Sequence, residues 1–241
     1  MTGPEGQPAV WIDEVSKRFS DGVLAVDALS LTVHHGEIAC VIGGRGAGKS
    51  VLLRMVAGLL RPSYGRILVR GQPVVNRVKT LEQLAFVGSR TAHAHLLSAV
   101  ENVEFYTTVS GVSCSRADCI QGLREAGLRE SALHVAAGEL GAEDHLLIWL
   151  ATATLRRASV IVFDDPSAGL EPSAIKLLQA WCERRRSTGT AILLATADPV
   201  LASQSDKIMV LVAGRKVSEK TRQEFTAQSL MALYMESLGH Q

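Results

Sequence analysis

A loop with the pattern G-x-x-x-x-G-K-S carries the clearest chemistry in this chain. Its glycines let the backbone wrap around an anion without Cβ clashes, so that N–H groups and the start of the next helix face a phosphate. Lys49 adds positive charge near the β- and γ-phosphates, and the Ser50 hydroxyl is a ligand for Mg²⁺. We therefore predict that a nucleoside triphosphate is held by Gly43, Gly44, Arg45, Gly46, Ala47, Gly48, Lys49, Ser50 and Val51.

The residues on both sides of this loop have the context that the motif requires. Residues 37–42, which are apolar after Glu37, are typical of a short buried strand, and residues 51–60 have apolar side chains at helical spacing. A strand that enters the loop and a helix that leaves it argue against a chance match.

A pair of carboxylates follows a second apolar run. Residues 160–163 are all apolar, as expected for a parallel strand covered on both faces, and Asp164 and Asp165 come directly after them. A carboxylate at the end of such a strand lies at the same sheet edge as the phosphate loop, where it can organise Mg²⁺. We predict that Asp164 and Ser50 form the metal site. The pair alone fits a solvated loop start equally well.

Strands that alternate with helices position these groups. Apolar runs predict strands at 10–15, 25–33, 37–42, 66–70, 81–87, 160–163, 191–195 and 207–212, and helices at 51–60, 173–186 and 226–238. Between residues 96 and 157 the apolar spacing is helical throughout. We expect an α/β fold: a P-loop NTPase core with a mostly parallel sheet, an N-terminal antiparallel β subdomain and an inserted α-helical subdomain. The core would comprise residues 1–95 and 158–241, and the subdomain residues 96–157, within a single domain.

Composition limits the class of protein. The 241 residues are 47% hydrophobic with a net charge of +1, which gives no argument for a nucleic-acid partner. We expect no signal peptide and no membrane span, because no basic-flanked N-terminal apolar segment and no run of 18 apolar residues occurs. The four cysteines are scattered, so we expect reduced thiols. We interpret His34, His35, His93 and His95 as loop residues and not as metal ligands.

The run D-D-P-S-A-G-L-E-P, residues 164–172, resembles the D-E-P-T-A-G-L-D-P block of ATP-binding-cassette (ABC) ATPases. Residues 36–38, 52–62 and 98–103 are similar to further segments of that family, and 229–234 are similar to the closing helix of its exporter branch. The resemblance covers nearly the whole chain. It implies ATP and Mg²⁺ as cofactors. A P-loop kinase or GTPase fits less well, because no guanine-reading N-K-x-D is present.

The resemblance also assigns roles to residues outside the loop. Phe19 falls where the family keeps an aromatic side chain that stacks on adenine, although simple packing explains it equally well. Ser89 replaces the family's glutamine near Mg²⁺ and reaches less far. Asp165 stands where the family has the glutamate that polarises the attacking water, and it is shorter by one methylene. Ala197 replaces the switch histidine and has no group that can bind the γ-phosphate or orient water.

A further departure lies in the segment that family members present to the ATP of a partner cassette, L-S-G-G-Q. Here it reads Leu140-Gly141-Ala142-Glu143-Asp144. Glu143 would oppose closure on a γ-phosphate, since like charges about 4 Å apart repel by about 4 kcal/mol at an effective dielectric of 20. Alternatively, the segment is an ordinary helix start capped by its own carboxylates, which offset the helix dipole.

These features predict the ATP-binding subunit of a membrane ABC transporter, of the exporter type, with weak hydrolysis of its own. Expected partners are an integral membrane subunit, docked through the helical subdomain and the Ser89 loop, and a second ABC ATPase subunit. A heterodimer is favoured over a homodimer, because a homodimer would have two doubly defective sites. We expect a cytoplasmic protein on the inner face of the cell membrane. The alternative is a regulatory or structural pseudo-ATPase that binds ATP without significant turnover.

Overall fold

The computed structural model describes residues 6–74, 82–88, 93–226 and 228–229. Its centre is a six-stranded sheet in the order β10-β9-β3-β8-β7-β6. Neighbouring strands are parallel except for β9 and β10, which form an antiparallel pair at one edge. The strands are β3 (Ile38–Ile42), β6 (Leu84–Gly88), β7 (Val160–Asp164), β8 (Ala191–Ala195), β9 (Lys207–Val212) and β10 (Arg215–Thr221).

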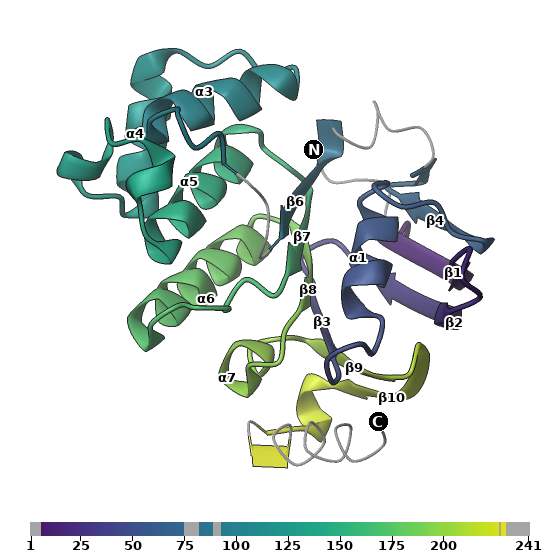
Figure 1. The fold of residues 1–241 in the computed structure, drawn as a ribbon. Helices are drawn as coiled ribbons and strands as arrows, with labels where there is room; N and C mark the ends of the chain where they lie inside the picture. Colours follow the sequence, from purple (N-terminus) through teal and green to yellow (C-terminus); the bar gives the residue numbers. More distant parts are fainter. Residues whose placement is uncertain (1–5, 75–81, 89–92, 227, 230–241) are drawn as a thin grey trace.

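A second, antiparallel sheet packs beside the first, as predicted for the N-terminal part. Its order is β2-β1-β4-β5, and its strands are β1 (Val10–Arg18), β2 (Leu24–Val33), β4 (Tyr64–Val69) and β5 (Gln72–Pro73). Helix α1 (Lys49–Val56) lies between the two sheets (Figure 1). Side chains alternate along β3, so Ala39 and Val41 join the apolar core around α1.

The other face of the central sheet is covered by helices. Ile38, Cys40 and Ile42 point to this side, into a core that they share with α6 (Pro172–Ser187) and α5 (Ala142–Leu155). Helices α3 (Ala99–Val109) and α4 (Arg116–Ala126) pack on α5, and the three form a helical group at one end of the molecule (Figure 1). Both faces of the parallel strands are therefore buried, which explains their continuous apolar sequences.

Polar side chains cap the starts of α3 and α4. Ser98 accepts a hydrogen bond from the Glu101 amide while the Glu101 carboxylate accepts one from the Ser98 amide. Ser115 and Asp118 make the same reciprocal pair at the start of α4. Each capping box satisfies amides that the first helical turn leaves unpaired.

Several elements differ from the sequence-based expectations. Helix α1 ends at Val56, because Gly58 turns the chain with a φ of 68° before the predicted end. Strand β10 and the four-residue helix α7 (Pro199–Ala202) were not predicted. Most of the predicted terminal helix lies outside the described residues, and the subdomain boundaries at 96 and 157 stay predictions. Within the described part of the chain, no helix combines the length and apolar character needed to cross a bilayer.

Candidate functional site

The phosphate loop connects β3 to α1 and is pressed against two neighbouring strands. A Cβ atom on Gly43 would lie 2.2 Å from the carbonyl oxygen of Leu211, and one on Gly48 would lie 2.3 Å from that of Ala25. Gly48 also has a φ of 100°, which side chains rarely adopt. No larger residue fits at either position, so these contacts with β9 and β2 fix the path of the loop.

The other predicted loop residues lie where the motif requires them. The Gly44 carbonyl accepts a hydrogen bond from the Ala47 amide at 3.2 Å, which closes the turn. Arg45 and Gly46 are exposed at its tip, and Val51 is half-buried in the first turn of α1. The exposed tip leaves the loop open to a ligand.

Lys49 is held by the loop that it follows. Its Nζ donates to the carbonyl oxygens of Gly43 at 2.7 Å and Gly44 at 2.9 Å. Burial lowers the pKa of Lys49, whereas the negative charges of Asp165 and Asp164 raise it. The ammonium group therefore lies at the loop, close to both carboxylates.

Ser50 and Asp164 meet at the carboxyl edge of the sheet. The Ser50 hydroxyl donates to Asp164 Oδ1 at 2.8 Å, and Asp164 is 4% exposed at the end of β7. Ligands bind at this edge in open α/β sheets, and oxygen atoms are the ligands that Mg²⁺ prefers. The pair fits a magnesium ion that keeps several waters. The described residues contain no group of three His, Cys, Asp or Glu side chains arranged around a metal.

Asp165 follows in a left-handed conformation with a φ of 54°. Its amide donates to the Ala195 carbonyl at 2.8 Å, which fixes the turn. Aspartate adopts this conformation more readily than most residues. Burial raises the pKa of Asp165, Lys49 opposes that rise, and the nearby Asp164 carboxylate adds to it.

Ala197 lies on the next loop, after β8, and is exposed. The two loops are joined by hydroxyl groups, because Ser167 Oγ and Thr196 Oγ1 are 3.0 Å apart and Thr196 is fully buried. Thr196 Oγ1 also accepts a hydrogen bond from the Asp198 amide at 2.9 Å. Sequence reasoning missed this connection, since nothing in the sequence pairs residue 167 with residue 196.

The predicted adenine-stacking residue Phe19 comes from the N-terminal sheet. Phe19 follows β1, is 37% exposed, and has the Lys17 ammonium 5.4 Å from its ring centroid. An exposed ring of this kind is available for stacking. Ser89 lies outside the described residues.

The segment 140–144 is a helix start. Gly141 is the N-cap of α5, and Glu143 and Asp144 lie in the first turn. This agrees with the alternative of an ordinary helix start, in which the two acidic side chains offset the helix dipole. The capping itself is not seen, because Gly141 has no side chain and no side-chain hydrogen bond caps the helix. Asp144 instead pairs with Arg129 at 3.2 Å. Glu143 is exposed.

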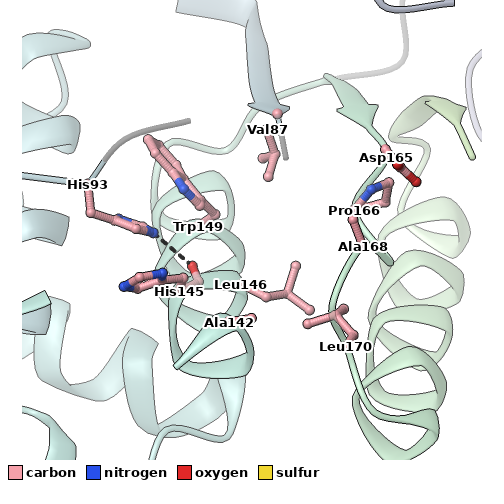
Figure 2. A pocket seen from close by; sticks show the side chains of 11 residues that line it. Val87, His93, Ala142, His145, Leu146, Trp149, Asp165, Pro166, Ala168 and Leu170 are labelled. Carbon is pink, nitrogen blue, oxygen red and sulfur yellow. Dashed lines mark hydrogen bonds between the residues drawn. The ribbon is translucent and has the colours of Figure 1, made fainter. Parts of the chain in front are cut away.

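His93 lies in a loop, as predicted, but its side chain is buried. It is 4% exposed and lines a cavity of about 110 Å³ that also reaches Asp165. Its Nε2 donates to the His145 carbonyl at 3.1 Å, and its ring centroid is 4.9 Å from that of Trp149. Figure 2 shows these three residues on one side of the cavity and Asp165 on the other. Burial and neighbouring histidines lower the pKa of His93 to about 4.

Comparisons with known proteins agree on one family. The family model described as "ABC transporter" matches residues 26–168. The lipoprotein-releasing system ATP-binding protein LolD 1 of Rhodospirillum rubrum is 31% identical over 88% of this chain and 99% of its own length. The Nod factor export ATP-binding protein I of Burkholderia lata is 34% identical over 85% of this chain and 68% of its own.

The chain spans only about a third of another relative. The macrolide export ATP-binding/permease protein MacB of Hyphomonas neptunium is 28% identical over 92% of this chain but 36% of its own length.

Among solved structures, a dimeric, post-hydrolysis form of the ATP-binding cassette MJ0796 bound to ADP and Pi has a TM-score of 0.81 at 22% identity. That match covers 90% of this chain and 100% of the cassette. At this identity the likeness shows the fold alone.

Proposed function

The chain belongs to the ABC transporter family, and we propose that it is the ATP-binding subunit of a membrane transporter with weak ATP hydrolysis of its own. One observation carries this proposal. Lys49, Ser50 and Asp164 gather at one sheet edge, whereas the adjoining loop presents an exposed Ala197. Groups that would hold phosphate and metal gather here, and the side chain that would sense the γ-phosphate is replaced by alanine.

The proposal that the chain binds ATP rests on the groups that the site offers to phosphate and to Mg²⁺. The loop supplies backbone amides, Lys49 a positive charge, and Ser50 and Asp164 two oxygens suited to Mg²⁺. Phe19 supplies a ring on which adenine can stack. Together these residues would bind ATP with Mg²⁺, which orients and neutralises the phosphates when bound.

The proposal of weak hydrolysis rests on two departures from the family pattern. One lies at the ATP bound to this chain, and the other lies in the segment that faces the ATP of a second cassette. Asp165 is one methylene shorter than glutamate, and a misplacement of about 1 Å costs on the order of 100-fold in rate. Glu143 would bring an exposed negative charge to the ATP of a second cassette. A homodimer would combine both defects in each site. A heterodimer with a competent cassette is therefore the favoured pairing, and a homodimer is the second choice.

The membrane partner would dock on the helical group. Leu96 is 94% exposed, although its loop is held in place. The fully buried Asn102 side chain makes hydrogen bonds to the backbone of Ala94, Leu97 and Ser98. Phe105 and Val109 on α3 are also exposed. Apolar side chains on a rigid support are typical of an interface. The predicted Ser89 loop would complete this surface.

Export is the favoured direction of transport, because several relatives are named as export proteins. The subunit would be cytoplasmic, bound to the inner face of the cell membrane, with no nucleic-acid partner. The exposed Ala197 also favours the second candidate, a regulatory pseudo-ATPase of a membrane complex that retains bound ATP.

Affinity purification from membranes tests the transporter assignment. We expect the wild-type chain to co-purify with an integral membrane protein and a second cassette, in an assembly that hydrolyses ATP. Leu96→Glu should abolish this recovery, whereas the matched variant Val217→Glu, on exposed β10, should retain it. Recovery of the wild-type chain only as a free monomer would contradict the assignment. An assembly with both partners but without ATPase activity would favour the pseudo-ATPase.

A further inference from the structure

The start of α4 carries two cysteines at positions that a capped helix brings together. Ser115 is the N-cap, and its amide donates to the Asp118 carboxylate at 2.9 Å while its hydroxyl accepts from the Asp118 amide at 3.1 Å. Cys114 therefore precedes the cap and Cys119 is the fourth helical residue. These are the two positions of the hydrophobic staple, at which side chains often pack on each other and fix how the chain enters the helix.

The surroundings of the two thiols agree with this arrangement. Cys119 is fully buried in the core beneath α4, and Cys114 is half-buried and packs against the same core. Both are free thiols. Burial raises the pKa of Cys119 to about 11, and the charge of a Cys114 thiolate contributes to the rise. Cys114 is thus the accessible member of the pair, and Cys119 stays protonated beside it.

We propose that Cys114 and Cys119 are a modification site, at which a peroxide converts the two thiols into a reversible disulfide across the start of α4. The Cys114 thiolate attacks one peroxide oxygen, the O–O bond breaks, and hydroxide leaves, which gives a sulfenic acid. The Cys119 sulfur then attacks the Cys114 sulfur; its proton and the sulfenic OH leave as water. The two sulfurs are oxidised and the peroxide is reduced to two waters.

This division of roles follows from the burial of each thiol. A sensing cysteine must meet the oxidant, which Cys114 can do and Cys119 cannot. A resolving cysteine must lie next to it, which the staple provides. The site is separate from the phosphate loop, so the inference does not depend on the proposed function.

Tryptic mapping of the full chain reads out the disulfide directly, because Arg116 lies between the two cysteines. Cleavage after Arg116 places Cys114 on peptide 91–116 and Cys119 on peptide 117–124. After hydrogen peroxide and thiol alkylation, we expect these peptides to be joined in mass spectra recorded without reductant, and to separate after dithiothreitol. Cys40 and Cys182, both buried, serve as internal controls and should remain unpaired.

Two variants separate the steps. Cys114→Ser should abolish the joined peptides and leave Cys119 unoxidised. Cys119→Ser should leave a Cys114 sulfenic acid that dimedone traps. The proposal is overturned if the wild-type peptides stay separate, whether Cys114 remains reduced, proceeds to sulfinic acid, or links two chains. It is equally overturned if Cys119 is oxidised in the Cys114→Ser variant.

Discussion

Ser167 Oγ and Thr196 Oγ1 lie 3.0 Å apart and join the loop that carries Asp165 to the loop that carries Ala197. The Asp165 amide adds a second connection through its 2.8 Å hydrogen bond to the Ala195 carbonyl. These two loops are therefore joined to each other at two points beside the nucleotide site. What differs from the family pattern is the side chains that this backbone presents.

Side-chain repair should therefore restore activity. We expect Asp165→Glu with Ala197→His to restore the activation of water at the ATP bound to this chain. Gly141→Ser with Glu143→Gly should restore the segment that faces the ATP of a second cassette. Each pair alone should change phosphate release little, and the four together should raise it on the order of 100-fold, since positioning effects have that size. The same four changes on a Lys49→Ala background are the control and should stay inactive. Equal activity of the fourfold variant and the wild type would contradict this account.

Removal of the charge at the start of α5 should favour pairing. Glu143 is exposed in the first turn, where a like charge on ATP would meet it. We expect Glu143→Gln to tighten ATP-dependent self-association at least about tenfold, or about 1.4 kcal/mol, measured by analytical ultracentrifugation. Glu139→Gln removes an exposed charge just outside the segment and should have little effect. If both variants behave alike, Glu143 does not oppose closure.

Asp164 should make ATP binding depend on magnesium. Its carboxylate accepts the Ser50 hydroxyl at 2.8 Å, so both oxygens are in place for the metal. Calorimetry with and without Mg²⁺ should show a strong enhancement for the wild type. We expect Asp164→Asn to weaken that enhancement at least about tenfold, the scale of changes around metal ligands. Asp165→Asn is the matched control and should keep it; loss in both variants would place the metal differently.

Buried His93 should make the fold sensitive to acid. Its pKa falls from the usual 6.5 to about 4, so between these values the unfolded chain binds a proton that the folded chain does not. The free energy of unfolding should therefore drop as the pH falls through this window, by on the order of 3 kcal/mol in total.

Urea unfolding of wild type and His93→Leu at pH 7 and pH 5 measures this effect. The variant should lose less stability on acidification than the wild type. His134→Gln, at an exposed position, should behave as the wild type does. Parallel losses in wild type and His93→Leu would assign the acid sensitivity to other groups.

The sequence predicts those features of the fold and the site that depend on local motifs, and it misses those that depend on partners distant along the chain. The meeting of Ser50 and Asp164 was predictable, because a loop motif and an apolar strand each place their side chains at the same sheet edge. Strand β10 was not, since residues 215–221 are mostly charged or polar and look like a loop until β9 pairs with them. The family of the chain was also predictable, because the motif after Asp164 is specific.

The environment of His93 was not predictable from local sequence. Its burial depends on His145 and Trp149, both on α5 and more than fifty residues away along the chain. The pairing of Asp144 with Arg129, fifteen residues earlier in the chain, was not predictable either. In both cases the side chain meets partners that are distant in the sequence.

Parallel assays of ATP binding and steady-state phosphate release on the purified chain and its Lys49→Ala variant test the central claim most directly. We predict that the wild-type chain binds ATP with Mg²⁺, that the variant does not, and that the wild-type chain alone turns over well below about 1 s⁻¹, the low end of typical enzymes. A wild-type rate of many turnovers per second that disappears in Lys49→Ala would contradict the account.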